Sequence, residues 1–329
     1  MKYAVIGTGY WGSNHARIAS ELRSEGVIEE AYLCDADEER VSEIAEAYDL
    51  PYVTDYADLP DEGVTAATLS TPSPTHHDIA VDLLESGVDL LIEKPLALDS
   101  DDAWSIVETA DAENRVLAVG HIFRFHPALK ELKRRIDRGE LGRIKYMNTR
   151  RFSFRVPRAT TGVLYSLAVH DVDISNYLLD DAPNDIYCRL DSVVRDDIDE
   201  TATLVLNYDE ATSVINESWQ VPVFGKQRDL VVVGSEKAAY VDYLEDNVVE
   251  IHESRVVKHG DELRALEEGG KTYEVENDEP LRVEVDDFVS ACKERTEPSS
   301  PGRIGAEVVE QLELAEKSSE RNQTVPLDR

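Results

Sequence analysis

The feature that most constrains the fold is a short apolar run followed by three closely spaced glycines and then by helix-forming residues. The run is "KYAVI" (residues 2–6), and Gly7, Gly9 and Gly12 belong to "GTGYWGSNHAR". Glycines at this spacing let a chain turn tightly from a strand into a helix and let a pyrophosphate approach the helix N-terminus. The same triplet also fits a strand-to-helix turn that binds no nucleotide, so its context must decide.

Asp35 supplies that context. It ends the second apolar run, "EAYLCD", about 20 residues after the last glycine, where dinucleotide-binding domains place the carboxylate that binds the adenosine ribose. A carboxylate here repels a 2′-phosphate, and the next basic residue along the chain is Arg40. The sequence therefore favours NAD over NADP. The alternative is a nucleotide-free turn with Asp35 as a plain surface acid.

Apolar strand-like runs alternate with amphipathic segments up to about residue 120. Strands that are apolar on both faces and alternate with helices predict an α/β fold with a doubly wound parallel sheet. We therefore expect a Rossmann domain over residues 1–121. Turn-separated β-rich runs follow, which predict an α+β domain with a mostly antiparallel sheet over residues 122–329.

Four helices are expected after residue 120. They lie near residues 126–138, 163–179, 281–295 and 302–319. The last of them is expected to pack back on the first domain. The polar, Gly- and Glu-rich segment 258–280 is expected to be a loop.

The composition is strongly acidic, with 68 Asp and Glu against 34 Lys and Arg and a formal net charge of −34. Such a surface is typical of proteins that work in molar salt, where the Debye length falls to about 3 Å. This charge disfavours nucleic acid and anionic membranes as partners. The sequence holds no run of roughly 20 apolar residues, and we expect a cytoplasmic protein. The three cysteines lie far apart, so no disulfide or metal site is expected.

Two segments place polar side chains where a reaction crevice is expected. Lys94 and Pro95 in "EKPLA" follow an apolar run, at the carboxyl edge of the predicted sheet. A lysine there can be catalytic or merely solvated. In "LYSLAVHDVDI" a continuous α-helix would put Ser166, His170 and Asp173 on one face. His170 is a candidate general base, or else a core histidine paired with Asp173.

Basic residues gather between Arg124 and Arg158, which is unexpected in so acidic a chain. Arginine forks bind phosphate bidentately, so those in "RRFSFRVPR" can hold the diphosphate of a nucleotide-sugar, with Phe152 or Phe154 against its base. The alternative is ion pairing with the acids of a neighbouring subunit. The four arginines of this segment are Arg150, Arg151, Arg155 and Arg158.

The motifs together resemble one known family. "GTGYWGSNHAR", "DAD", "STPSPTHHDIA", "EKPLA", "GHIFRFHP" and "AVHDVDI", in this order, are similar to the Gfo/Idh/MocA family of NAD(P)-dependent sugar oxidoreductases. The stretch from "GHIFRFHPALKEL" to "LAVHDVDI" resembles the branch that oxidises UDP-N-acetylhexosamines. The resemblance implies an open sheet that packs against a second subunit, in a homodimer or homotetramer.

The resemblance also implies roles for individual residues. Lys94 and His170 would be catalytic, and Pro95 would follow a cis peptide bond. We expect NAD to contact residues of the glycine turn, of the second strand end and of two later loops: Gly7, Thr8, Gly9, Tyr10, Trp11, Gly12, Asp35, Thr71, Pro72, His76, Glu93 and Lys94. We expect the substrate to contact Lys94, Arg124, Arg150, Arg151, Arg155, Ser166, His170 and Asp173.

Ser166 departs from the family pattern, in which many members carry an aspartate four residues before the histidine. A serine hydroxyl holds no negative charge at neutral pH that would make the histidine more basic. Either His170 works with Lys94 alone, or Asp171 or Asp173 orients it, or turnover is impaired. The sequence thus favours an NAD-dependent dehydrogenase of a nucleotide-linked sugar. A free sugar or inositol dehydrogenase and a non-catalytic NAD-binding subunit are the alternatives.

Overall fold

The computed structural model describes residues 1–157, 161–222, 225–245, 247–266 and 269–327. Its contacts divide the chain into two units, one formed by Met1–Ile122 with Pro280–Glu310 and the other by Phe123–Glu279 with Gln311–Arg329. The helix expected near 302–319 is α8 (Gly302–Arg321), which contributes residues to both units. Arg158 lies outside the described residues.

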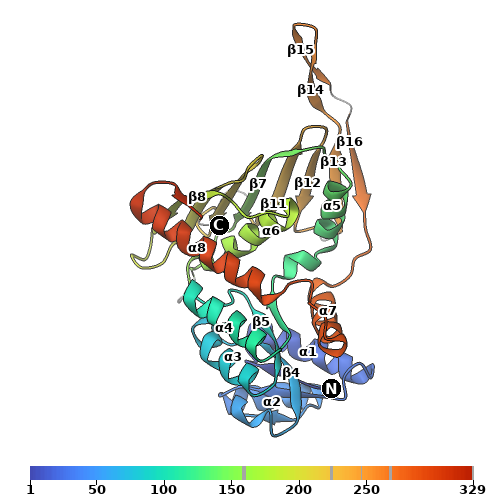
Figure 1. Ribbon diagram of the computed structural model, residues 1–329, viewed down its shortest axis with the longest axis vertical. Helices are drawn as coiled ribbons and strands as arrows, with labels where there is room; N and C mark the ends of the chain where they lie inside the picture. Colours follow the sequence, from blue (N-terminus) through green and yellow to red (C-terminus); the bar gives the residue numbers. More distant parts are fainter. Residues whose placement is uncertain (158–160, 223–224, 246, 267–268, 328–329) are drawn as a thin grey trace. The chain divides into compact units, whose positions relative to one another are not determined.

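The first unit is built on a six-stranded parallel sheet of order β3-β2-β1-β4-β5-β6 (Figure 1). Its strands and helices alternate along the chain, as the sequence predicts. The strands are β1 (Lys2–Ile6), β2 (Glu30–Cys34), β3 (Tyr52–Val53), β4 (Val64–Leu69), β5 (Asp89–Glu93) and β6 (Leu117–Gly120). The helices are α1 (Tyr10–Ser24), α2 (Glu38–Tyr48), α3 (His76–Glu85), α4 (Ser100–Ala112) and α7 (Pro280–Glu294), with short 3₁₀ turns η1 (Tyr56–Asp58) and η2 (Ser73–Thr75).

Both faces of this sheet are buried, which explains why its strands are apolar on both sides. On one face, side chains of α3 and α4 pack with Val309 of α8 in one apolar cluster. On the other face, Ile18 of α1 and Phe288 of α7 belong to a second apolar cluster. The cysteines are free and buried.

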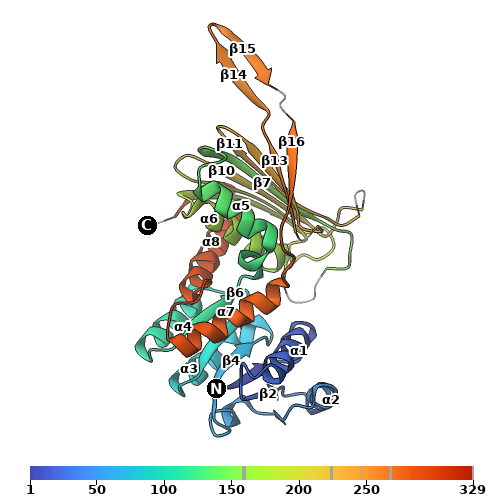
Figure 2. The same ribbon diagram turned by 90° about the vertical axis from the view of Figure 1, so that its right-hand side faces the viewer.

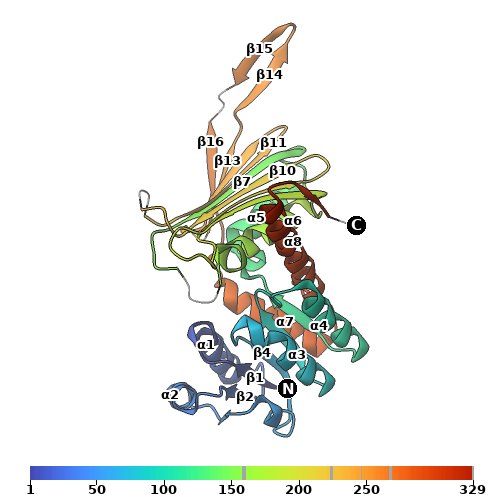
Figure 3. The ribbon, with the colours of Figure 1, turned by 90° about the vertical axis from the view of Figure 1, so that its left-hand side faces the viewer.

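The second unit holds a nine-stranded mixed sheet of order β16-β13-β12-β11-β7-β10-β9-β8-β17, in which only β7 and β10 of the described strands pair in parallel. Helices α5 and α6 lie on one face of it (Figure 3). The helical segments are η3 (Ile122–Phe125), α5 (Pro127–Asp137), a π-helical turn η4 (Leu164–Ala168) and α6 (Val169–Leu179). The strands are β7 (Ile144–Phe152), β8 (Asp185–Asp191), β9 (Thr201–Asn207), β10 (Thr212–Ser218), β11 (Gln227–Gly234), β12 (Ala238–Asp242), β13 (Val248–His252), β16 (Gly270–Glu274) and β17 (Val325–Pro326).

The expected loop over 258–280 is wrong. Strands β14 (Arg255–His259) and β15 (Glu262–Leu266) form a separate two-stranded hairpin, and β16 joins the edge of the large sheet (Figure 2). The hairpin is exposed on both faces, with Val256 68% and Leu263 73% exposed. Strands that bury neither face show no apolar alternation, and this alternation is the signal by which a sequence predicts strands.

The helical segment expected over 163–179 is present, but it is not α-helical throughout. Residues Leu164–Ala168 form a π turn, and the α-helix begins at Val169. A π turn holds more residues than an α turn, so the spacing assumed between Ser166 and His170 does not apply. No helix in the described ranges is long and apolar enough to cross a membrane.

A buried ion pair joins α6 to β7. The Arg151 guanidinium donates to both Asp171 oxygens, with Nε–Oδ2 at 2.6 Å and Nη2–Oδ1 at 3.1 Å. The two side chains are 2% and 0% exposed. Buried Glu217 lies beside them, and burial together with the charge of Asp171 raises the pKa of its carboxyl well above the usual range. The Arg151 guanidinium thus compensates the charge of the Asp171 carboxylate, whereas the Glu217 carboxyl is driven towards its neutral form.

We expect Arg151→Met to lower the free energy of unfolding by about 3–5 kcal/mol, because it leaves the Asp171 charge buried without its partner. Denaturant unfolding in molar KCl measures this loss. The control is Arg189→Met, which removes an exposed guanidinium from the pair with Asp191 and should change stability by no more than about 0.5 kcal/mol. Equal, small effects of both changes would contradict the assignment.

Candidate active site

The three glycines of the turn differ in the space around them. Gly9 faces open space, whereas Gly7 and Gly12 leave no room for a side chain. Gly7 has φ +85°, and a Cβ there would lie 2.8 Å from Thr71 N. A Cβ on Gly12 would lie 1.7 Å from the Gly7 carbonyl oxygen, so α1 packs directly on the turn. At Gly9 no heavy atom of the described chain lies within 4 Å of the place that a Cβ would take. This open position at the N-terminus of α1 suits a pyrophosphate.

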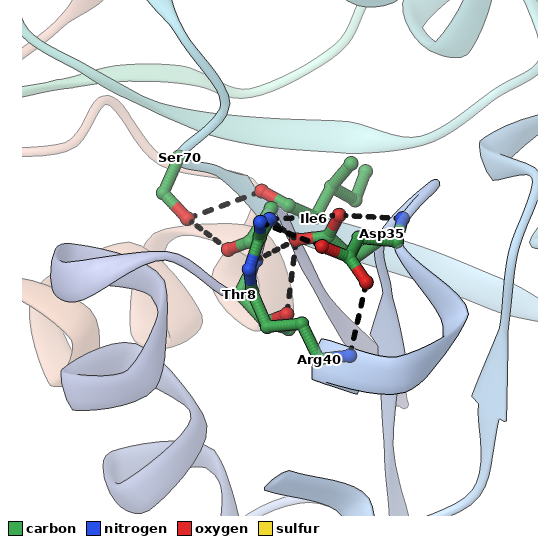
Figure 4. Close-up of polar contacts among 7 residues, drawn as sticks. Ile6, Thr8, Asp35, Arg40 and Ser70 are labelled. Carbon is green, nitrogen blue, oxygen red and sulfur yellow. Dashed lines mark hydrogen bonds and ion pairs between the residues drawn. The ribbon is translucent and has the colours of Figure 1, made fainter. Parts of the chain in front are cut away.

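Asp35 is held at the mouth of the turn by several donors (Figure 4). The Thr8 N–H and hydroxyl donate to Oδ2 at 2.7 and 2.9 Å, and the Asp37 N–H donates to Oδ1 at 3.0 Å. Burial alone would raise the pKa of the Asp35 carboxyl, but these hydrogen bonds outweigh burial and lower it. Asp35 is therefore a fixed carboxylate, as the ribose of NAD requires.

Two residues of this corner were not expected from the sequence. The Arg40 guanidinium donates to both Asp35 oxygens at 3.3 Å and to Asp37 at 2.8 Å (Figure 4). The Ser70 hydroxyl donates to the Gly7 carbonyl at 2.8 Å and ties the loop after β4 to the glycine turn. The contact of Arg40 with Asp35 could have been predicted from the sequence, because Arg40 lies in the first turn of α2, five residues after Asp35. A serine directly after a strand gives no signal of its own.

Lys94 follows β5 directly, and its peptide bond to Pro95 is cis. The preceding residue, Glu93, receives a hydrogen bond from buried His15 of α1, with Nε2–Oε1 at 3.0 Å. Burial alone would raise the pKa of Glu93, but the bond from His15 and the charge of Lys94 lower it. Gly120 of β6 makes room for this carboxylate, since a Cβ there would lie 3.2 Å from Glu93 Oε2.

The remaining residues expected to contact NAD differ in exposure. Tyr10 and Trp11, at the start of α1, are 82% and 40% exposed. Pro72 is exposed after β4. His76 is fully buried, with both ring nitrogens near main-chain carbonyl oxygens. The Thr71 hydroxyl accepts a hydrogen bond from the hydroxyl of a threonine four residues later, at 2.8 Å.

In the second unit, His170 lies on the first turn of α6 against an aromatic ring. Its imidazole meets the Phe123 ring edge to face, with centroids 5.0 Å apart. The Arg151 guanidinium lies over the Phe123 ring, 4.2 Å from the ring centroid, and the centroid of the Tyr243 ring lies 5.2 Å from that of Phe123. Phe123 and Tyr243 were not expected from the sequence, because neither carries a polar pattern that points to a site.

The acids around His170 bind arginines. Asp171 is paired with Arg151, and Asp173 accepts from Arg124 Nε at 2.8 Å and Nη2 at 2.6 Å. Ser166 lies 3.0 Å from the Thr161 hydroxyl. These contacts give Asp171 and Asp173 strong cationic partners within their own unit.

Of the other arginines in the basic segment, Arg150 is paired with a carboxylate and Arg155 is exposed. Arg150 makes a bidentate pair with Asp229 of β11, with both distances 2.8 Å. Arg155 is exposed and lies over the Trp219 ring, 5.7 Å from its centroid. Phe154, one residue earlier, is 69% exposed. The ion pairs of Arg150 and Arg151 are thus made with acids of the same chain.

Two family models match this chain. Residues 1–121 match the Gfo/Idh/MocA oxidoreductase family with its NAD-binding Rossmann fold, and residues 129–240 match the C-terminal domain of that family. The chain belongs to the Gfo/Idh/MocA family. It is an oxidoreductase whose relatives are NAD-dependent sugar and polyol dehydrogenases, and its first domain is the NAD-binding one.

Several named enzymes are similar to this chain. UDP-N-acetylglucosamine 3-dehydrogenase from Acidithiobacillus ferrooxidans is 28% identical over 88% of each chain. Inositol 2-dehydrogenase from Mycolicibacterium smegmatis is 34% identical over 55% of this chain and 53% of the relative. The solved structure of the first enzyme covers 98% of both chains with a TM-score of 0.83 and 24% identity. Levoglucosan dehydrogenase with NADH and levoglucosan covers all of both chains with a TM-score of 0.87 and 18% identity.

Two glycines of the turn, Gly9 and Gly12, allow a matched pair of substitutions that separates NAD binding from folding. We expect Gly9→Ala to fold with stability within about 0.5 kcal/mol of wild type and to weaken NAD binding at least about tenfold, because its methyl group fills only the ligand's space. We expect Gly12→Ala to cost about 1–3 kcal/mol of folding stability as well, because its methyl group meets the Gly7 carbonyl. Calorimetric NAD titration and denaturant unfolding measure both. Wild-type NAD affinity in Gly9→Ala would show that the pyrophosphate does not bind here.

Proposed function

We propose that the chain oxidises a hydroxyl group of a nucleotide-linked sugar, such as a UDP-N-acetylhexosamine, with NAD as oxidant. The observation that carries the redox part is the glycine turn, open at Gly9 and closed at Gly12, beside the fixed Asp35 carboxylate. The relative that spans 88% of this chain is named for a UDP-sugar substrate, which supports the substrate class.

His170 is proposed as the general base. An imidazole titrates near neutral pH and can accept the hydroxyl proton as the carbinol carbon becomes a carbonyl carbon. The hydride from that carbon passes to the nicotinamide when NAD is bound. Phe123 supports one side of the imidazole and limits its orientations. Asp171 and Asp173 each bind an arginine, and we propose that Lys94 assists His170.

Lys94 is proposed to bind the reacting oxygen. Its position directly after β5 places it at the carboxyl edge of the parallel sheet, where open α/β sheets bind their ligands. An ammonium group donates to the hydroxyl oxygen and favours the negative charge that develops there as the proton leaves.

The nucleotide part is proposed to bind beside Arg155. Arg150, Arg151 and Arg124 are committed to carboxylates, whereas Arg155 offers an exposed guanidinium next to exposed Phe154. A guanidinium binds the diphosphate and an aromatic ring stacks on the base. Oxidation of a free polyol is the second candidate, favoured by the similarity to inositol dehydrogenases over about half the chain.

We expect Lys94→Ala and His170→Ala each to lower kcat by at least about 100-fold, as the loss of an acid–base or polarising group does. NAD affinity should change little. NADH formation with the sugar substrate in molar KCl measures turnover, and His252→Ala, which alters a partly exposed histidine paired with Glu250, is the control. Rates near wild type in both variants would refute these roles.

We expect Arg155→Ala to raise the KM for a nucleotide-sugar at least about tenfold, because one charge-assisted contact to the diphosphate is lost. The KM for a free sugar or polyol should stay unchanged. Arg189→Ala, an exposed arginine on β8, is the matched control. If the chain turns over free polyols faster than nucleotide-sugars and Arg155→Ala has no effect, the second candidate is correct.

A further inference from the structure

One buried histidine of the first unit bridges the two loops that border the proposed reaction crevice. The His76 ring is fully buried at the start of α3. Its Nε2 lies 2.9 Å from the carbonyl oxygen of Thr71, in the loop after β4, and its Nδ1 lies 3.0 Å from that of Pro95, in the loop after β5. Both ring nitrogens therefore face main-chain carbonyl oxygens, and the ring lies between the two loops.

The protonation of this ring decides which loop it holds. A neutral imidazole carries one N–H, so it donates to only one of two carbonyl oxygens. Burial lowers the pKa of His76, and the carbonyls of Thr71, Pro95 and Leu96 oppose that effect only in part. At neutral pH the ring is thus neutral and makes one strong hydrogen bond. The Thr71 carbonyl is nearer to the ring by 0.1 Å and has the largest single effect, whereas the other two carbonyls, of Pro95 and Leu96, both belong to the loop that carries Lys94.

We propose that His76 is a positioning residue for Lys94, which it holds by donating from Nδ1 to the Pro95 carbonyl oxygen. This inference rests on the proposed function, in which Lys94 binds the reacting oxygen. The residue on the other side of Lys94 is held by its side chain, because the Glu93 carboxylate accepts a hydrogen bond from His15 of α1. Lys94 thus lies between two residues that are each fixed by a buried histidine from a different helix.

The consequence is that a change at His76 acts on turnover through the placement of Lys94. Misplacement of a catalytic group by about 1 Å can lower a rate by roughly 100-fold. The charged groups that act on the ring and its surroundings are Glu93 and Lys94 themselves. His77, the next residue, is partly exposed and contacts Asp78 and Ser105, so it provides a neighbouring histidine with no tie to either loop.

Asparagine and glutamine test which ring nitrogen matters. The amide nitrogen of asparagine takes the place of Nδ1, and that of glutamine takes the place of Nε2. We expect His76→Asn to keep kcat within about threefold of wild type. We expect His76→Gln and His76→Leu to lower kcat by about 10- to 100-fold with little change in the KM for the sugar. His77→Leu is the control and should keep the wild-type kcat.

Two measurements need neither NAD nor turnover. The rate at which an amine-selective acylating reagent labels Lys94, followed by peptide mass spectrometry, should change in His76→Gln and His76→Leu but not in His76→Asn. Nitrogen NMR of histidine-labelled protein should show the Nδ1–H tautomer for the signal that disappears in His76→Leu. If His76→Leu does not fold, the difference in kcat between His76→Asn and His76→Gln still tests which ring nitrogen is needed.

An Nε2–H tautomer of His76 would overturn the inference, and so would a wild-type kcat in His76→Leu. It would also be overturned if His76→Gln kept kcat and His76→Asn lost it, or if both variants lost kcat equally. Lys94→Ala separates this failure from that of the proposed function. If Lys94→Ala loses turnover and His76→Leu keeps it, only the positioning role is wrong. If Lys94→Ala itself turns over at the wild-type rate, the proposed role of Lys94 is wrong.

Discussion

The contact between α1 and the glycine turn determines the rest of the first unit. Gly12 allows the helix to lie against the Gly7 carbonyl oxygen with no side chain between them, and Gly7 occupies a left-handed conformation that brings it against the loop after β4. This approach leaves the N-terminus of α1 open at Gly9. It also puts Thr8 where its N–H and hydroxyl fix Asp35. One close backbone contact therefore shapes both the phosphate end and the ribose end of the proposed NAD site.

In the same unit, buried or half-buried side chains connect the loops at the carboxyl edge of the parallel sheet. They bind main-chain carbonyl oxygens or, in one case, a carboxylate. Ser70 binds the Gly7 carbonyl, His76 lies between the carbonyls of Thr71 and Pro95, and His15 binds Glu93. Such bonds fix loops without placing net charge in the crevice, apart from Glu93. Lys94 follows β5 in one of these loops, and its ammonium group is the one that we propose acts on the reacting oxygen.

The parts of the fold that follow from local pattern were predictable from sequence. The parallel sheet, the glycine turn and helices α5, α7 and α8 agree with the predictions because apolar periodicity and turn residues lie within a few positions of one another. The β14–β15 hairpin was missed because it buries neither face. The partners of the arginines were missed because Asp171 and Asp229 lie 20 and 79 residues away from theirs, and sequence alone does not pair such distant charges.

Those ion pairs also change how a cluster of arginines is interpreted in so acidic a chain. Arg124, Arg150 and Arg151 each bind an aspartate of the same unit, whereas Arg155 is exposed, which is the basis of its proposed role in binding a diphosphate. The substrate class can be tested directly with UDP-N-acetylglucosamine that carries deuterium on the ring carbon at position 3, incubated with the protein and NAD in molar KCl. Mass spectrometry of the NADH formed should find one deuterium per molecule, transferred from the sugar. Unlabelled NADH, or labelled NADH obtained only from a deuterated free polyol, would contradict the account.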